Sequence, residues 1–128
     1  MFFTIYNWVC RRKNTVNYGD IFNSACMNGD TECVKIMLKK NYKSINQEEG
    51  LLIACKYGKS DIVELLIDSN MHIIILCLTY AVEYNMYDTV KLLLDRGVSA
   101  EYGYKYATNN RMSSLLYNNK VKSITIYK

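Results

Sequence analysis

One pattern recurs along this 128-residue chain. In each copy an alanine is followed four residues later by a glycine or an asparagine, and then by an aspartate and an amphipathic stretch. The clearest copy reads ACKYGKSDIVELLIDSN at residues 54–70, and the others read ACMNGDTECVKIMLKKN at 25–41 and AVEYNMYDTVKLLLDRG at 81–97. Such an internal repeat predicts stacked copies of one small unit rather than a single irregular core.

Each copy predicts two helices joined by a tight turn. A large apolar residue stands three positions before each alanine, one helical turn away on the same face. The pairs are Phe22 with Ala25, Leu51 with Ala54 and Leu78 with Ala81, and Tyr104 with Ala107 is a fourth possible pair. Gly29, Gly58 and Asn85 follow, and these residue types adopt the left-handed conformation that ends a helix. Aspartates 30, 61 and 88 then favour a new helix, because a carboxylate caps its first amides.

The second helix of each copy carries one apolar stripe at helical period. Its members are Cys33, Val34, Met37 and Leu38; Ile62, Val63, Leu66 and Ile67; and Thr89, Val90, Leu93 and Leu94. We expect these helices to end at Asn41, Asn70 and Gly97, residues suited to a left-handed cap. The apolar face of one unit is too large to be hidden alone, so neighbouring units must stack.

The units resemble ankyrin repeats over roughly residues 20–105. The alanine, the glycine and DIVELLI of the second copy, and YDTVKLLLDRGVSAE of the third, are similar to that family. The resemblance implies an all-α, ankyrin-type helix-turn-helix solenoid of about four stacked repeats. It also implies a non-catalytic, cofactor-free module that binds a partner protein through its concave surface.

The chain departs from the ankyrin pattern in two places. The T-P-L-H-x-A opening keeps only its leucine and alanine, and Leu52 stands where the histidine would be. The units are 29, 27 and 26 residues apart, shorter than the usual ~33. The missing residues fall where the family places its β-hairpin fingers, so we expect reduced fingers.

The pattern also predicts the boundaries of the units. We expect ankyrin-like repeats over 19–110, with units at about 19–45, 46–73, 74–100 and 101–118. The fourth is degenerate, because it keeps Tyr104, Ala107 and Leu116 but lacks the glycine. Residues 1–18, with Phe2, Phe3, Ile5, Trp8 and Val9, are expected to cap the first unit. Residues 119–128 are expected to form a tail, in which VKSITIYK is either a short strand or frayed.

No motif for catalysis or for metal binding accompanies the repeats. The only histidine, His72, lies between two predicted helices without a serine or cysteine partner pattern. The five cysteines are odd in number and form no C-x-x-C pair, which argues against a disulfide framework or a zinc site and favours a reducing compartment. We expect Cys26 and Cys55 to be buried apolar fillers. The chain is therefore predicted to be no enzyme and to hold no cofactor or metal.

The location and the class of partner follow from charge and hydropathy. No apolar run approaches the roughly 18 residues of a spanning helix, and Arg11, Arg12 and Lys13 lie behind the apolar N-terminus, opposite to a secretory signal. A cytoplasmic protein is predicted, with membrane docking by the N-terminus as the weaker alternative. Nucleic-acid binding by CRRKN and MLKKNYK is disfavoured, because acidic residues are interleaved through the repeats. The oligomeric state stays open.

The residue composition bears on the source of the chain. Asn, Ile, Lys and Tyr are abundant and proline is absent, as in AT-rich genomes. In this the chain is similar to the solitary ankyrin proteins of large DNA viruses. That resemblance implies engagement of a host factor in the host cytoplasm, and a structural or virion-assembly component is the alternative.

A row of tyrosines marks the candidate binding face. The positions one before and three after each alanine point away from the core of the unit. They are occupied by Ser24 and Asn28, Ile53 and Tyr57, Tyr80 and Tyr84, and Tyr106 and Asn110. Tyrosine is enriched at protein interfaces because it combines a large contact area with one polar tip. Ile53, Tyr57, Tyr80, Tyr84 and Tyr106 are the predicted partner-binding residues, although a chain with 12 tyrosines places some on any surface.

Overall fold

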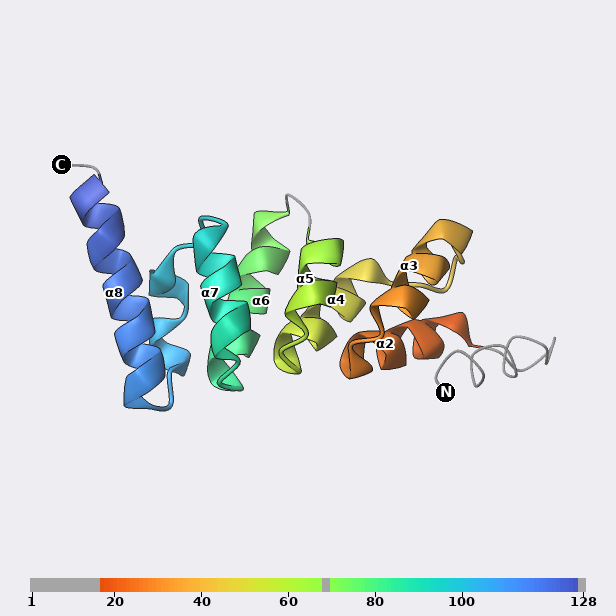
Figure 1. The fold of residues 1–128 in the computed structure, drawn as a ribbon, viewed down its shortest axis with the longest axis horizontal. Coiled ribbons are helices and arrows are strands. Elements are labelled where there is room, and N and C mark those ends of the chain that lie inside the picture. The colour runs from red at the N-terminus through yellow and green to blue at the C-terminus, as the bar shows by residue number, and fades with distance from the viewer. Residues whose placement is uncertain (1–16, 68–69, 127–128) are drawn as a thin grey trace.

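The computed structural model describes residues 17–67 and 70–126, with side chains up to Lys120 in the last helix. Over these ranges the chain is helical and contains no β-strand (Figure 1). The elements are α2 (Tyr18–Asn28), α3 (Thr31–Lys40), α4 (Gln47–Lys56), α5 (Ser60–Leu66), α6 (Met71–Glu83), α7 (Tyr87–Asp95), the 3-10 turns η1 (Ala100–Tyr102) and η2 (Tyr104–Tyr106), and α8 (Asn110–Ile126). The predicted N-terminal cap, residues 1–18, lies outside the described residues except for its last two.

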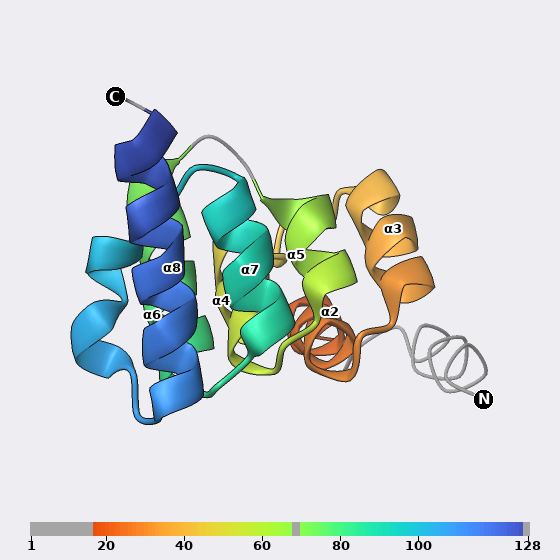
Figure 2. The ribbon, with the colours of Figure 1, turned by 60° about the vertical axis from the view of Figure 1, so that its left-hand side comes forward.

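The helices form a row of antiparallel pairs, α2 with α3, α4 with α5 and α6 with α7. Helix α4 packs against both α2 and α6, while α5 packs against α3 and α7. First helices and second helices therefore make two layers, and α8 closes one end of the row beside α7 and η1 (Figures 1 and 2). The all-α helix-turn-helix solenoid is confirmed, and no β-hairpin finger occurs between the repeats in the described part.

The residues predicted to be buried form the core of the stack. Ala25, Ala54 and Ala81 are fully buried, as are their partners Phe22 and Leu78, and Leu51 is nearly so. The second-helix stripe is buried in all three repeats, with Leu38 and Ile67 only partly covered. Thr89 is the buried polar member of the stripe, and its hydroxyl lies 2.9 Å from that of Ser60. That hydrogen bond joins α5 to α7 and satisfies a group whose burial would otherwise be costly.

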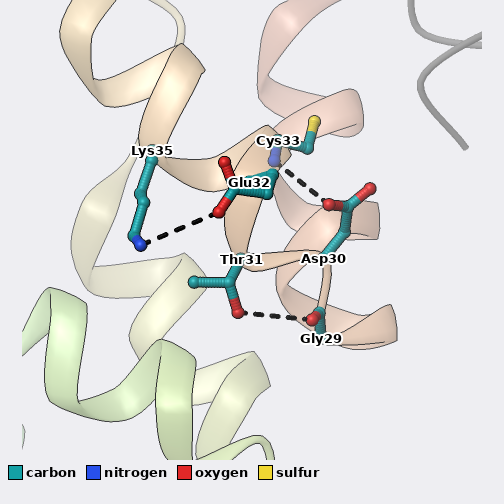
Figure 3. A network of polar contacts seen from close by, with 6 residues as sticks. All are labelled: Gly29, Asp30, Thr31, Glu32, Cys33 and Lys35. Atoms are coloured by element: carbon teal, nitrogen blue, oxygen red, sulfur yellow. Dashed lines mark hydrogen bonds and ion pairs between the residues drawn. The ribbon is translucent and has the colours of Figure 1, made fainter.

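The turn within each pair has the predicted left-handed residue. The φ angles are 75° at Gly29, 70° at Gly58 and 61° at Asn85. In the first turn, Asp30 caps α3 by accepting a hydrogen bond from the Cys33 amide at 3.1 Å (Figure 3). Figure 3 also shows the Thr31 hydroxyl donating to the Gly29 carbonyl and the Lys35–Glu32 ion pair on the same helix. The polar groups named here are therefore satisfied by residues of the same repeat.

These turns also contact the following repeat. A Cβ on Gly29 would lie 3.0 Å from Cδ of Lys59, and one on Gly58 would lie 2.5 Å from Sδ of Met86. In the third turn Asn85 accepts hydrogen bonds from the Thr108 hydroxyl at 3.2 Å and the Asn109 amide at 2.9 Å. The glycines thus admit a side chain of the next unit, and the asparagine reaches the next unit by hydrogen bonds instead.

Gly58→Ala is expected to lower the free energy of unfolding by about 2–4 kcal/mol, combining left-handed strain of about 1–2 kcal/mol with overpacking against Met86. Gly97→Ala is the matched control, because Gly97 has φ 96° and nothing within 4 Å of an added Cβ. It should show the backbone strain alone. Urea denaturation of both variants measures the difference, and equal losses would mean that Met86 does not cover Gly58.

Asn41 and Gly97 end their helices as predicted, with φ 54° and 96°, but the prediction for Asn70 is wrong. Helix α5 ends at Leu66, Ile67 is extended, and Asn70 has φ −74° and ψ 95° as the N-cap of α6. The reason is that asparagine is favoured both at helix N-caps and in left-handed C-caps, so its type does not decide between them.

The fourth unit differs from the first three. Where a helix was expected around Ala107, the chain forms η1 and η2, and Ala107 is extended with φ −67° and ψ 123°. Gly103 between the turns is buried, and a Cβ there would lie 3.0 Å from Val82 and 3.3 Å from Leu116. The Tyr104 hydroxyl donates to the Leu116 carbonyl at 3.3 Å. Close packing of these turns on α6 and α8 takes the place of the first helix.

The C-terminal segment is neither a strand nor a frayed tail up to Ile126, because α8 continues through it. The helix is capped by the Asn109 side chain, which accepts from the Met112 amide at 2.8 Å. Met112 and Leu116, four residues apart, are fully buried. Once a helix is capped and one of its faces is buried, adding further residues to it costs little free energy. This outweighs the strand preference of the β-branched residues near its end.

Candidate functional site

The outer face of the first helices exposes three of the predicted tyrosines. Tyr57, Tyr80 and Tyr84 have exposed fractions of 41%, 36% and 43%, although they are large side chains that usually bury more of their surface. Their neighbours Ala54 and Ala81 point into the core, so the helical period turns Tyr80 and Tyr84 outward. Helices α4 and α6 pack side by side, which places the three tyrosines on adjacent repeats.

Lys56 lies among these tyrosines. Its Nζ is 5.0 Å from the centre of the Tyr84 ring and 5.9 Å from that of Tyr57. The neighbouring Tyr84 is the main cause that raises the pKa of Lys56 above its ordinary value, and Tyr57 and Tyr80 add to it. The lysine is therefore a permanent cation at neutral pH, held over aromatic faces that attract it. We call Lys56, Tyr57, Tyr80 and Tyr84 the lysine–tyrosine cluster.

The other two predicted residues are less exposed than these tyrosines. Ile53 is half-buried and packs against the core of the stack. Tyr106 lies in η2, is half-buried against the same core, and has the Lys105 ammonium 5.1 Å above its ring. Two of the four tyrosines, Tyr57 and Tyr84, thus share one lysine over their rings, whereas Tyr106 pairs with a lysine of its own unit.

The first repeat carries no aromatic side chain at the equivalent outward positions. They are occupied by Ser24 and Asn28, and the Asn28 amide donates to the Ser24 carbonyl at 2.8 Å. The exposed aromatic surface on this face therefore belongs to the second and third repeats. The sequence-based prediction missed Lys56, although its place beside Tyr57 and two residues after Ala54 was a usable signal.

The cysteines of the described ranges belong to the core rather than to a site. Cys26, Cys33, Cys55 and Cys77 are all buried, and Cys26, Cys55 and Cys77 are free thiols. Burial raises the pKa of the Cys26 thiol to about 12, and the neighbouring Cys33 adds to the effect. A buried protonated thiol behaves as a small apolar side chain, as expected for Cys26 and Cys55.

At pH 8 the Cys26 thiol of the folded protein should react with iodoacetamide at least about a hundredfold more slowly than in the denatured protein, since the thiolate is the reacting form. The buried, protonated thiol of Cys26 contributes fully to the free energy of unfolding below about pH 8.5, the pKa of a cysteine in the unfolded chain. This contribution is lost as the pH rises toward 12. Alkylation with and without guanidinium chloride, followed by peptide mass spectrometry, measures the ratio. Equal rates would contradict the burial of Cys26.

Groups that signal other functions are not found in the described part of the chain. Residues 17–67 and 70–126 contain no cluster of three His, Cys, Asp or Glu side chains suited to a metal ion. In the same ranges no helix is both long and apolar enough to cross a membrane. His72 is exposed in the first turn of α6, rather than in a loop between helices as predicted.

Comparison with known proteins agrees with this architecture. A sequence model of the family described as ankyrin repeats (3 copies) matches residues 7–76 and residues 22–105. The chain belongs to the ankyrin-repeat family, as its resemblance predicted. Searches among curated proteins and among solved structures returned no significant match. Ankyrin repeats are generally protein–protein interaction modules and are typically not catalytic.

Proposed function

We propose that this protein is a non-catalytic module that binds a partner protein through the outer face of its first helices, the concave side of an ankyrin stack. The observation that carries the proposal is the lysine–tyrosine cluster, in which three exposed tyrosines lie on two adjacent repeats and two of them, Tyr57 and Tyr84, contact one lysine. The half-buried Ile53 and Tyr106 complete the proposed surface.

The energetics of interfaces support this choice of surface. Binding energy concentrates in a few aromatic or arginine side chains near the centre of an interface, and tyrosine is among the most frequent of them. A tyrosine loses little rotamer freedom when it is covered, because it has only two side-chain torsions. The packed α4–α6 pair therefore presents its aromatic area at low entropic cost.

For the biological setting we propose a viral protein that engages a host factor in the host cytoplasm. The support is the AT-rich type of composition together with a chain made largely of ankyrin repeats. In a structural or assembly role the chain would instead bind a second copy of itself, and in a nucleic-acid role its binding would fall steeply with salt.

Differential capture from a eukaryotic cell extract tests the proposed surface. Wild-type protein, the double variant Tyr80→Ala with Tyr84→Ala, and the control Lys91→Ala are immobilised in equal amounts, and retained proteins are identified by mass spectrometry. Lys91 is exposed on α7, in the layer of second helices. We expect at least one protein to be retained by the wild type and by Lys91→Ala but not by the double variant. Identical retention by all three would contradict the proposal.

A further inference from the structure

Lys56 differs from the paired cations of this protein in what it contacts. Among the residues whose side chains are described, three ion pairs are formed elsewhere, Lys35–Glu32 at 3.8 Å, Arg96–Glu64 at 3.5 Å and Lys120–Glu101 at 3.4 Å. Lys56 instead lies over the rings of Tyr57 and Tyr84, and within the described ranges no carboxylate lies within 4.0 Å of its ammonium. Even Glu83, the residue before Tyr84, is exposed and does not pair with it.

This arrangement keeps hydrogen-bonding capacity available on an ordered cation. An ammonium has three donors, and the contacts of Lys56 with the faces of the Tyr57 and Tyr84 rings, at 5.9 Å and 5.0 Å from the ring centres, leave these donors available. The rings of Tyr57 and Tyr84 restrict the flexible side chain, so less rotamer entropy is lost when a further group binds. A carboxylate on an incoming molecule would meet a charge that no acidic residue of the described chain neutralises.

We propose that Lys56 is the anchor for a single carboxylate on an acidic peptide segment of the partner protein, the flanking residues of which cover Tyr80 and Tyr84. This inference rests on the proposed function and adds the chemistry of the partner. Charge complementarity selects an acidic segment, because Lys56 is an unneutralised cation at the centre of the aromatic surface.

The neighbourhood of Lys56 also limits how acidic the segment is. Exposed Glu83 follows Tyr80 by three residues on α6 and repels a second carboxylate placed beside the first. Tyr57, Tyr80 and Tyr84 favour apolar or aromatic neighbours, since their rings offer contact area rather than charge. We therefore expect one aspartate or glutamate flanked by aliphatic or aromatic residues, and not a polyacidic run.

Selection from a library of random 12-residue peptides displayed on phage tests this inference without a known partner. Wild type, Lys56→Met and the matched control Lys105→Met are used as targets, because Lys105 also lies over a tyrosine ring but outside the cluster. Wild type and Lys105→Met should enrich peptides with one acidic residue at a fixed position, and Lys56→Met should not. A synthetic peptide from the selection should bind Lys56→Met about tenfold more weakly, the effect of losing one charge-assisted hydrogen bond.

A double-mutant cycle decides whether the selected carboxylate meets Lys56. Replacing the acidic residue of the peptide by its amide should weaken binding to wild type about tenfold and should change binding to Lys56→Met by less than about twofold. Lys56→Arg should retain most of the affinity. Peptides that lack an acidic residue, peptides indifferent to Lys56, or a selection without binders would each overturn the inference. If peptides that do not need Lys56 still need Tyr80 and Tyr84 for binding, the proposed binding face is retained. If they need neither tyrosine, the proposed binding face fails together with the inference.

Discussion

Phe22→Ala is expected to lower the free energy of unfolding by about 3–5 kcal/mol, the usual cost of emptying a buried aromatic site. Phe22 is fully buried between α2 and α4, and its ring is so close to Gly50 that a Cβ there would lie 2.5 Å from Cε1. Gly50 itself has no side chain that could fill the vacated space. Urea denaturation followed by helical circular dichroism measures the loss, which is a large part of the ~5–15 kcal/mol that stabilises a typical domain.

Met27→Ala is the control for this loss. Met27 lies on the same helix but is 39% exposed, so its truncation should cost less than about 1 kcal/mol. A loss below about 1 kcal/mol for Phe22→Ala would mean that α2 does not pack on α4 through Phe22. That result would remove the basis for the first repeat of the stack.

The second large effect is on binding. Tyr80→Ala and Tyr84→Ala are each expected to weaken binding of the captured partner at least about tenfold, since truncation of a central aromatic anchor costs about 2 kcal/mol or more. Both side chains are exposed, so the melting temperature should change little. Titration by isothermal calorimetry measures the affinity, and thermal unfolding of the same samples measures the stability.

Two comparisons make that result specific. Lys91→Ala on α7 should leave affinity unchanged, because it lies on the other layer of the stack. The pair Arg11→Ala with Arg12→Ala tests the basic N-terminal segment. Normal binding by the tyrosine variants together with lost binding by the arginine variant would transfer the partner site to that segment.

The repeat made much of the fold predictable from the sequence. Alanine with a large apolar partner three residues earlier identified the buried face of α2, α4 and α6, because only a small residue fits where two helices approach closely. Glycine or asparagine four residues later identified the turns, because few other residues adopt a φ of 61–75° at low cost. These rules act within one unit, so they can be read from local sequence.

The features that were predicted wrongly depend on neighbouring units. Asn70 begins α6 rather than ending α5, and the fourth unit replaces its first helix by two 3-10 turns around buried Gly103. Lys56 was overlooked for a related reason, since its importance comes from Tyr84 on the next repeat. A residue type alone does not show which side chain of a neighbouring unit will lie above it.

Hydrogen–deuterium exchange of the complex with the captured partner tests the central claim most directly. Binding on the proposed face should slow amide exchange in α4 and α6, above all near Ile53–Tyr57 and Tyr80–Tyr84, and leave α3 and α7 unchanged. Tyr80→Ala with Tyr84→Ala should abolish that protection at equal protein concentrations. Protection confined to α3, α7 or the N-terminal segment would contradict the claim that this ankyrin stack binds its partner through the lysine–tyrosine cluster.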